Sequence, residues 1–567
     1  MSTTGYEKGK PDTGWWLGQV RNGIEYRKKY AKEADWDRWR KYYRGEFQRG
    51  QLPVNLFFRM LRSVVPQIYF RNPSLSVIST KTGVEQQVFA QLIERIDNKL
   101  MRTMNVKTSM KAAVHSTWMF GTGAVKLGYG AQFTPTPEFL DTSAPEEFKY
   151  QMTRKVEYNS QVEPNMPWLM NVPTGSLIVP KGLSNYEDTP WVAMWIRRPL
   201  DDVQNDPRLK NTAGLTSSSS KGLPGMQASG IKSDNPDEID LVEIRDMRTK
   251  TVMILAPFCT DKVLYIGEDE LQNNNRPNIY PIVFNPDDEV FWGVPDSVIL
   301  EPQQLELNEI RTLTMKHRRL SITKLLYKQG AIEPGEIEKL LNGDVMSAIR
   351  VLGDLSDIDT IDLSRIPESL FAADQQLQGD VRDSMGFSRN QTGSYQSDKS
   401  HNAPTAMEAR IVQAASGIRV DERRDILADV LVNIFEDTNE LVFNKWQDEQ
   451  VIQVMGPDTI PYWVAFKPAM LKAAKYQINI EPDSTEPETK DMRMQKAMQL
   501  YPMLKDNPLI DPTLLTSHLL RSFHGNEWDD MIKAIEQNAV QGLPGSTPQN
   551  PMGPEDMMAM QMGQKNT

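Results

Sequence analysis

Apolar residues follow two spacings along the first half of the chain, and the change between them predicts where helices and strands lie. Up to residue 120 the spacing is helical: Trp36, Trp39 and Tyr43 recur at i, i+3 and i+7 on one face of a helix predicted over 14–45. Three further helices are predicted over 54–70, 86–104 and 107–120. The first of these is expected to kink or end near Pro66.

From about residue 121 to residue 295 the pattern is that of strands broken by Gly and Pro. A glycine-flanked strand over 121–130 comes first. Its glycines lack the GxGxxG spacing of a nucleotide loop, so we interpret them as turn and close-packing positions. Trp168, Trp191 and Trp195 are expected to fill a core between sheet and helices. The stretch 211–236 is rich in Ser, Gly, Lys and Pro, which predicts a flexible exposed loop.

The second half of the chain is mostly helical in pattern. Its predicted elements are, in order, a helix over 296–320, a strand-helix-strand module over 321–366, a helix over 367–386, a polar segment over 387–404, a long amphipathic helix over 405–446, strands near 462 and 476, helices over 489–505, 513–521 and 529–537, and a disordered tail over 541–567. The helix over 296–320 would be about 37 Å long at 1.5 Å per residue. This mixture of elements predicts an α+β fold.

Composition narrows the class of protein. At 567 residues, 39% of them apolar and 25% charged, the chain exceeds what one core usually serves, so we expect two or more lobes. No run approaches the roughly 20 apolar residues of a membrane helix, and the N-terminus has no secretory signal pattern. The single cysteine, Cys259, excludes an internal disulfide and a cysteine-based zinc site. We therefore expect assembly in a reducing cytosol and no membrane partner.

Charge is unevenly distributed. The net charge is −11, yet residues 1–62 carry 14 Lys/Arg against 7 Asp/Glu. An acidic body argues against tight wrapping of nucleic acid, because affinity for nucleic acid comes from neutralised phosphates. It is compatible with a surface past which DNA moves without sticking, but on its own it is better explained by simple solubility.

The motifs of common enzymes are missing. There is no GxxxxGK[ST] loop, no HExxH and no GxSxG. The five histidines are scattered, and acidic pairs such as Asp201-Asp202 are placed as helix caps or solvated acids. We therefore expect a structural or assembly role, with no enzymatic activity, no catalytic residue, no metal and no cofactor.

The helix over 296–320 has sorted charges. Acidic residues lie toward its N-terminus and basic residues toward its C-terminus, among them Lys316, Arg318 and Arg319. Matching of the helix dipole explains this order well.

The order and spacing of six sequence segments allow the chain to be compared with known protein families. The segments are WDRWRKYYRGEF, LPVNLFF, PQIYFRNP, TGAVKLGYG, NVPTGSLIVPKGLSNYEDTPWVAMWIRRPLDDV and YPIVFNPDDEVFWGVPDSVILEPQQLELNEIRTLTM. By their order and spacing the chain resembles the portal proteins of tailed bacteriophages and their prophages, over roughly residues 14–540. No single string is diagnostic.

The resemblance implies a portal-type fold and its division into parts. These would be a wing over 1–295 (with the flexible loop 211–236) and 405–485, stem helices over 296–320 and 367–386, a small α/β clip over 321–366, a channel loop over 387–404, and a helical crown over 486–540.

The resemblance also implies function and partners. The protein would form a ring of twelve copies at one capsid vertex of the virion, with a channel for packaging and ejecting double-stranded DNA without sequence specificity. Expected partners are the terminase large subunit, the head-tail adaptor, the major capsid protein and a scaffold. Residues expected to face DNA are Lys316, Arg318, Arg319, Arg389, Lys399 and His401. For Arg318 and Arg319, a salt bridge to an acid of a neighbouring subunit is an equally good interpretation. Residues of the clip expected to meet partners are Glu333, Glu336, Glu338 and Lys339.

Two other functions stay open on the sequence. One is a different virion protein, such as a head-tail adaptor or scaffold, although an adaptor would be shorter and would lack paired stem helices. The other is a nuclease or ATPase of the packaging motor. The missing phosphate-binding loop argues against the ATPase, and a metal-dependent cleavage assay would test the nuclease.

Overall fold

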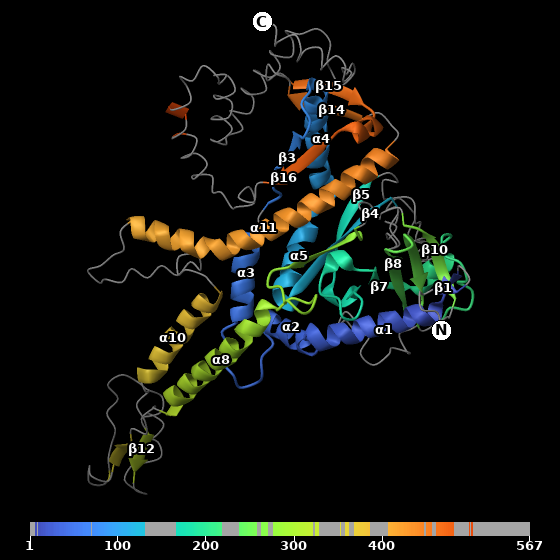
Figure 1. The fold of residues 1–567 in the computed structure, drawn as a ribbon. Coiled ribbons are helices and arrows are strands. Elements are labelled where there is room, and N and C mark those ends of the chain that lie inside the picture. The colour runs from blue at the N-terminus through green and yellow to red at the C-terminus, as the bar shows by residue number, and fades with distance from the viewer. Residues whose placement is uncertain are drawn as a thin grey trace, which may run out of the picture. The chain divides into compact units, whose positions relative to one another are not determined.

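The computed structural model contains both helices and sheets, which confirms the α+β class (Figure 1). It describes residues 6–7, 10–69, 71–130, 166–217, 238–257, 262–269, 276–320, 324–327, 352, 358–361, 368–385, 406–446, 450–455, 461–480, 498 and 501–502. The helices expected over 513–521 and 529–537, the tail and Cys259 lie outside these residues, as do most of the helix expected over 489–505 and most of the 211–236 loop. The chain divides into two compact units, one of residues 1–36, 61–295 and 417–567, the other of residues 37–60 and 296–416.

The first unit contains two antiparallel sheets and several helices. The helices are α1 (Thr13–Tyr30), the later part of α3 (Leu56–Ile68), α4 (Val84–Thr103), α5 (Val106–Phe120), α7 (Leu200–Asn205) and most of α11 (Ala406–Lys445). A five-stranded sheet has the order β10-β9-β8-β7-β6, made of Val263–Glu268, Thr251–Leu255, Glu238–Asp246, Trp191–Pro199 and Leu177–Ile178. A three-stranded sheet has the order β11-β4-β5, made of Ile279–Val283, Thr122–Tyr129 and Pro167–Val172.

Short strand pairs complete the first unit. They are β3 (Leu75–Ser79) with β16 (Tyr476–Ile480), β14 (Gln450–Met455) with β15 (Pro461–Phe466), and β1 (Tyr6–Glu7) with β2 (Lys10–Pro11). The strands expected near 462 and 476 are thus β15 and β16.

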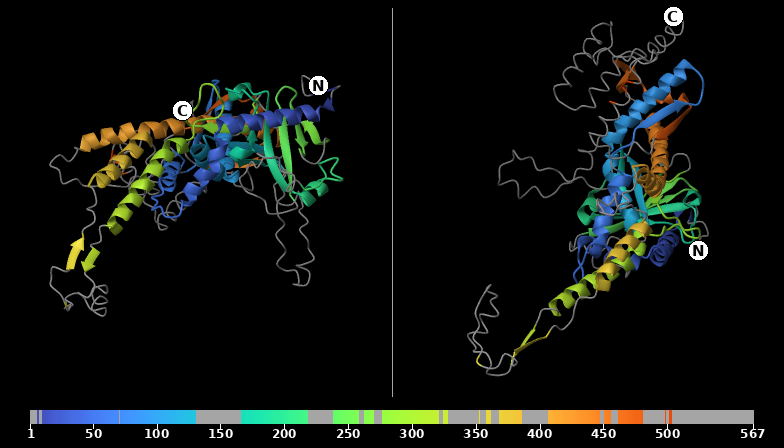
Figure 2. Two further views of the ribbon diagram at one scale, coloured as in Figure 1. Left: turned by 90° about the horizontal axis from the view of Figure 1, so that it is seen from below. Right: turned by 90° about the vertical axis from the view of Figure 1, so that its left-hand side faces the viewer.

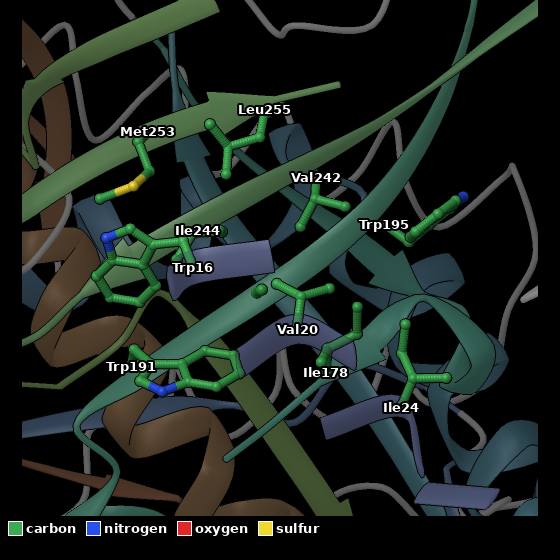
Figure 3. Close-up of a cluster of buried hydrophobic side chains, with 11 residues drawn as sticks. Trp16, Val20, Ile24, Ile178, Trp191, Trp195, Val242, Ile244, Met253 and Leu255 are labelled. Atoms are coloured by element: carbon green, nitrogen blue, oxygen red, sulfur yellow. The ribbon is translucent and has the colours of Figure 1, made fainter. Parts of the chain in front are cut away.

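One face of α1 packs on the five-stranded sheet (Figure 3). Trp16, Val20 and Ile24 recur at i, i+4 and i+8 and are buried. Trp16 meets Trp191 edge to face, with ring centroids 6.2 Å apart. Trp191 and Trp195 are in this core, as expected. Trp168 is only half-buried.

The single helix expected over 14–45 is wrong, because the chain turns at Ala31–Asp35. α1 ends at Tyr30, a 3-10 turn follows, and α2 (Trp36–Arg44) begins anew. Lys32 has φ +53° in the left-handed region, which breaks the helix. The buried Arg27 guanidinium holds the turn by its ion pair with Glu33 at 2.9 Å. Trp36, which the periodicity assigned to one face of a single helix over 14–45, is therefore the first residue of a second helix.

The glycine-flanked strand is β4, and its glycines permit close packing, as expected. A Cβ at Gly123 would lie 2.3 Å from the carbonyl oxygen of Ala113 on α5. Gly121 has φ +84°, and a Cβ there would lie 2.0 Å from the carbonyl oxygen of Gly293. These contacts require glycine because no side chain fits. They hold β4 against α5 and against the turn that precedes residue 296.

A buried ionic network joins the two sheets. Lys126 on β4 donates to Glu243 on β8 at 2.7 Å, and Arg245 pairs with both Glu243 and Asp269. Burial opposes ionisation of Glu243, but the neighbouring charges of Lys126 and Arg245 and their hydrogen bonds lower its pKa to about 2. The network has two positive and two negative side chains, so its charges balance.

The second unit contains two long helices and a short strand pair. Its elements are α2 from Asp37, the first residues of α3, α8 (Asp296–Leu320), β12 (Lys324–Tyr327), β13 (Ile358–Ile361), α10 (Glu368–Met385) and the first residues of α11. β12 and β13 are antiparallel, with Lys324 opposite Ile361. α8 has the bounds that the sequence predicted. Figure 1 and Figure 2 both show α8 and α10 side by side.

Candidate functional site

The pairing of α8 with α10 is the central feature of the second unit. Arg311 and Asp374 form an ion pair at 2.9 Å, and Gln303 donates to Ser384 at 2.9 Å. Residue numbers rise along α8 as they fall along α10, so the two helices are antiparallel. Their buried side chains are Leu300, Leu307, Ile310, Leu377, Val381 and Met385. Apolar burial therefore holds the pair together and polar contacts set its register.

A second face of α8 binds the main chain of residues 52–56 through a row of polar side chains. Gln304, Asn308 and Thr312 recur at i, i+4 and i+8 and are buried. The amide oxygen of Gln304 accepts from the Leu56 N–H at 2.7 Å, and its nitrogen donates to the Val54 carbonyl at 2.8 Å. We call these three residues the polar row.

The rest of the polar row continues the same pattern. Asn308 accepts from the Val54 N–H at 3.3 Å and from the Gln304 amide at 2.9 Å. Thr312 accepts from the Leu52 N–H at 3.0 Å. Without these partners the backbone groups of an extended segment against a helix would be buried and unpaired. The row thus gives the 52–56 segment a defined position on α8.

One turn earlier, Glu301 binds α2. Its carboxylate accepts from the Trp39 indole N–H at 2.9 Å and from the Arg38 guanidinium at 2.9 Å. Trp39 is fully buried, so its indole needs a partner. α8 is therefore held on one side by residues 38–56 and on another by α10.

The basic end of α8 carries three of the predicted DNA-facing residues. Lys316, Arg318 and Arg319 are all exposed. At 100° per residue, Lys316 and Arg319 lie about 60° apart on one face, and Arg318 points to another. The positive charges lie at the negative end of the helix dipole, which stabilises the helix. Chemically this end offers cations that suit phosphate oxygens.

The other predicted site residues lie outside the described part of the chain. They are Arg389, Lys399 and His401 in the expected channel loop and Glu333, Glu336, Glu338 and Lys339 in the expected clip. The structure thus brings together three of the ten predicted residues, at one helix end.

The sequence reasoning missed the polar row and Glu301. Four polar positions spaced by three or four residues on one helix face, Glu301, Gln304, Asn308 and Thr312, could have indicated a face that binds main chain. The charge pattern by itself indicates Glu301 only as an acid near the helix N-terminus.

Comparison with known proteins adds one structural likeness. No family model matches the chain, and no curated protein matches it. Among solved structures it is similar to a chain from a structure described as the neck of a native GTA particle computed with C12 symmetry. The TM-score is 0.37 at 10% sequence identity, over 86% of this chain and 93% of that chain. A likeness at this TM-score supports no conclusion about function.

Other candidate chemistry is sparse where the structure describes the chain. No group of three or more His, Cys, Asp or Glu side chains there is arranged to hold a metal, and no helix there is long and apolar enough to cross a membrane. Asp201 and Asp202 lie in the first turn of α7, but the N-cap is Pro199 and no side chain caps the helix, so the cap prediction is wrong for this pair. Burial raises the pKa of Asp202. A cavity of about 670 Å³ beside α11 contains the ion pair of Arg276 and Glu436, 2.6 Å apart.

One buried carboxyl group has few partners. Asp97 on α4 is fully buried, and the Asn439 amide on α11 donates to it at 3.1 Å. Burial raises the pKa of Asp97 well above its ordinary value of 3.8. The second carboxyl oxygen of Asp97 and the amide oxygen of Asn439 are both buried without a hydrogen bond. A proton on that carboxyl oxygen would supply a donor where two acceptors otherwise remain unpaired.

Proposed function

We propose that this chain is a portal-type protein of a tailed phage or prophage, which forms a ring at one capsid vertex. The ring would be the channel for packaging and ejecting double-stranded DNA. It would also be the docking platform for the terminase large subunit and the head-tail adaptor, with the major capsid protein and scaffold as further partners. In this proposal the protein acts by position and charge and has no enzymatic activity.

The observation that best supports the proposal is the order helix, strand pair, helix in the second unit. α8 and α10 lie antiparallel, and β12 and β13 pair between them in the chain. The sequence resemblance implies two stem helices and a clip over these residues. A head-tail adaptor or scaffold is less well supported, because neither function requires a pair of long antiparallel helices such as α8 and α10.

Repetition around a ring would give the basic end of α8 its role. Each copy would contribute Lys316 and Arg319, so the same charge would recur at one height of the channel. Such a belt attracts phosphates regardless of sequence, and no recognition helix in a groove is needed. The acidic remainder of the chain would keep the duplex from binding tightly. DNA could then slide.

The remaining parts would divide the other tasks. In this proposal 1–295 and 405–485 form the wing, 321–366 the clip that meets the motor and the adaptor, 387–404 the channel loop and 486–540 the crown. Arg389, Lys399 and His401 would add charge to the channel, and Glu333, Glu336, Glu338 and Lys339 would contact the docking partners.

Electron microscopy of the purified full chain tests the proposal. Negative-stain class averages along the symmetry axis are expected to have a central hole, with twelve copies around it. Strictly monomeric protein at high concentration, or closed particles without a through-hole, would contradict the proposal.

A further inference from the structure

α8 has a third face, away from α10 and from the polar row. Ile299, Leu305 and Leu313 on this face are 41%, 44% and 38% exposed. With Glu306 and Glu309, which are also exposed, they fall within about 120° of the helix circumference at 100° per residue. We call these five residues the outer α8 face. Large aliphatic side chains gathered on one exposed face are typical of an interaction surface.

A surface of opposite charge lies on the other segment of the same unit. Lys41, Arg44 and Arg49 are exposed, and beside them in the chain Leu52 and Phe58 are 44% and 49% exposed. We call these five residues the basic surface. The Phe58 ring lies 5.6 Å from that of Tyr43 on α2, which joins the two parts of this surface.

The two segments have opposite net charge. Residues 37–60 contain six basic and two acidic side chains, whereas residues 296–313 contain four acidic and one basic. Each surface also carries large apolar groups. The two surfaces are thus complementary in both respects.

We propose that the outer α8 face of one copy docks on the basic surface of a second copy. Because the two surfaces differ, the contact is heterologous, and repeating it gives a closed ring or an open filament. The polar row already holds residues 52–56 on a different side of α8, so the basic surface of a chain does not cover its own outer α8 face. The inference rests on the proposed function and deepens it by naming the surfaces that join neighbouring copies.

A second copy is favoured over other occupants by what the chain itself carries. DNA is disfavoured, because the outer α8 face presents the carboxylates of Glu306 and Glu309, which repel phosphates. The exposed Lys316 falls within the same arc but lies about two turns beyond Glu309, at the C-terminal end of the helix. A basic protein of another kind would fit the outer α8 face but would leave the basic surface without a partner. Each copy carries one outer α8 face and one basic surface, so self-docking gives both surfaces a partner.

Charge reversal on each surface tests the docking. E306K/E309K makes both surfaces of a copy basic, and K41E/R44E makes both more acidic, so each variant alone is expected to dissociate at least tenfold more readily than the wild type. Mixed in equal amounts, the two variants are complementary at every contact. The mixture is therefore expected to regain wild-type assembly, with copies alternating. Mass photometry and sedimentation velocity over a range of concentrations measure both effects.

A matched control separates docking from general charge effects. Glu422 and Asp425 are exposed on α11 at the same i, i+3 spacing, so E422K/D425K should assemble like the wild type. Circular dichroism and thermal unfolding of each variant check that it is folded. Folded variants that assemble normally, or a mixture that does not recover, would overturn the docking.

The outcomes also separate this inference from the proposed function. Wild-type rings with a central hole and unaffected variants would leave the portal proposal standing and overturn the docking. Wild-type assemblies without a hole that the variants dissociate and the mixture restores would do the reverse. Wild-type protein that is monomeric at every concentration would overturn both.

Discussion

Replacing Gln304 by alanine tests whether the polar row holds the 52–56 segment on α8. The Gln304 side chain makes three short hydrogen bonds, to the Leu56 N–H, to the Val54 carbonyl and to Asn308. Alanine removes all three and leaves two backbone groups without a partner. α8 itself should persist, because alanine is a strong helix former.

The size of the effect follows from these hydrogen bonds. The two hydrogen bonds from Gln304 to the segment contribute about 1 kcal/mol each, and the groups left unpaired by alanine add about 1 kcal/mol more. The loss for local opening of the segment is therefore about 3 kcal/mol, which is roughly a 100-fold change in the opening equilibrium, since 1.4 kcal/mol corresponds to a factor of ten.

Hydrogen exchange of the intact protein measures this local opening. Peptides that cover residues 52–60 are expected to exchange roughly 100-fold faster in Gln304→Ala, while peptides of the five-stranded sheet should not change. Gln376→Ala is the matched control, since Gln376 is exposed on α10. If the Leu56 amide exchanges at the wild-type rate in Gln304→Ala, the polar row does not hold this segment.

Three further changes probe other parts of the molecule. Burial raises the pKa of Asp97, so the folded protein keeps a proton that the unfolded chain releases above about pH 4, and the free energy of unfolding falls as pH rises from there toward the folded pKa. Asp97→Asn should remove this pH dependence, so thermal midpoints between pH 4 and 8 that fall equally in both proteins would contradict the assignment. Glu243→Gln leaves Lys126 without its charge partner inside the protein and should cost about 3 kcal/mol in urea unfolding; a loss below about 1 kcal/mol would mean that the network is not a closed ionic unit. K316A/R319A should leave assembly unchanged and reduce the salt dependence of DNA binding by the assembled protein, by about 0.9 in log-log slope for each phosphate that the variant no longer neutralises. An unchanged slope would remove both residues from the DNA-facing set.

The sequence predicted long, regular elements best. α8 was predicted with its observed bounds, and α10 and α11 to within one residue at each end, because many periodic positions define a long helix. The break between α1 and α2 was missed. It depends on Arg27 reaching Glu33 and on the left-handed Lys32, and interactions of this kind leave no periodic signal.

The candidate site was predicted less well for a related reason. Exposed charges such as Lys316 are visible in a sequence, since composition and position alone suggest them. The polar row binds the main chain of residues 52–56, about 250 positions away in the sequence. Every residue has the same main-chain groups, so the residue types at 52–56 do not reveal such a contact. What binds a backbone must therefore be found in a structure.

The pairing of β3 with β16 has a consequence for how the protein is made. One edge of β3 is satisfied close by in the chain, since Asn98 on α4 binds both backbone groups of Leu75. The backbone groups on the other edge of β3 pair only with β16. In this pairing Asn479 lies opposite Ser76, 403 positions away in the chain. During synthesis β3 would remain an open strand edge until most of the chain has left the ribosome, a state in which strands join wrong neighbours. A nascent chain stopped before Tyr476 should therefore aggregate. Pairing of this strand edge is completed only when β16 has been synthesised.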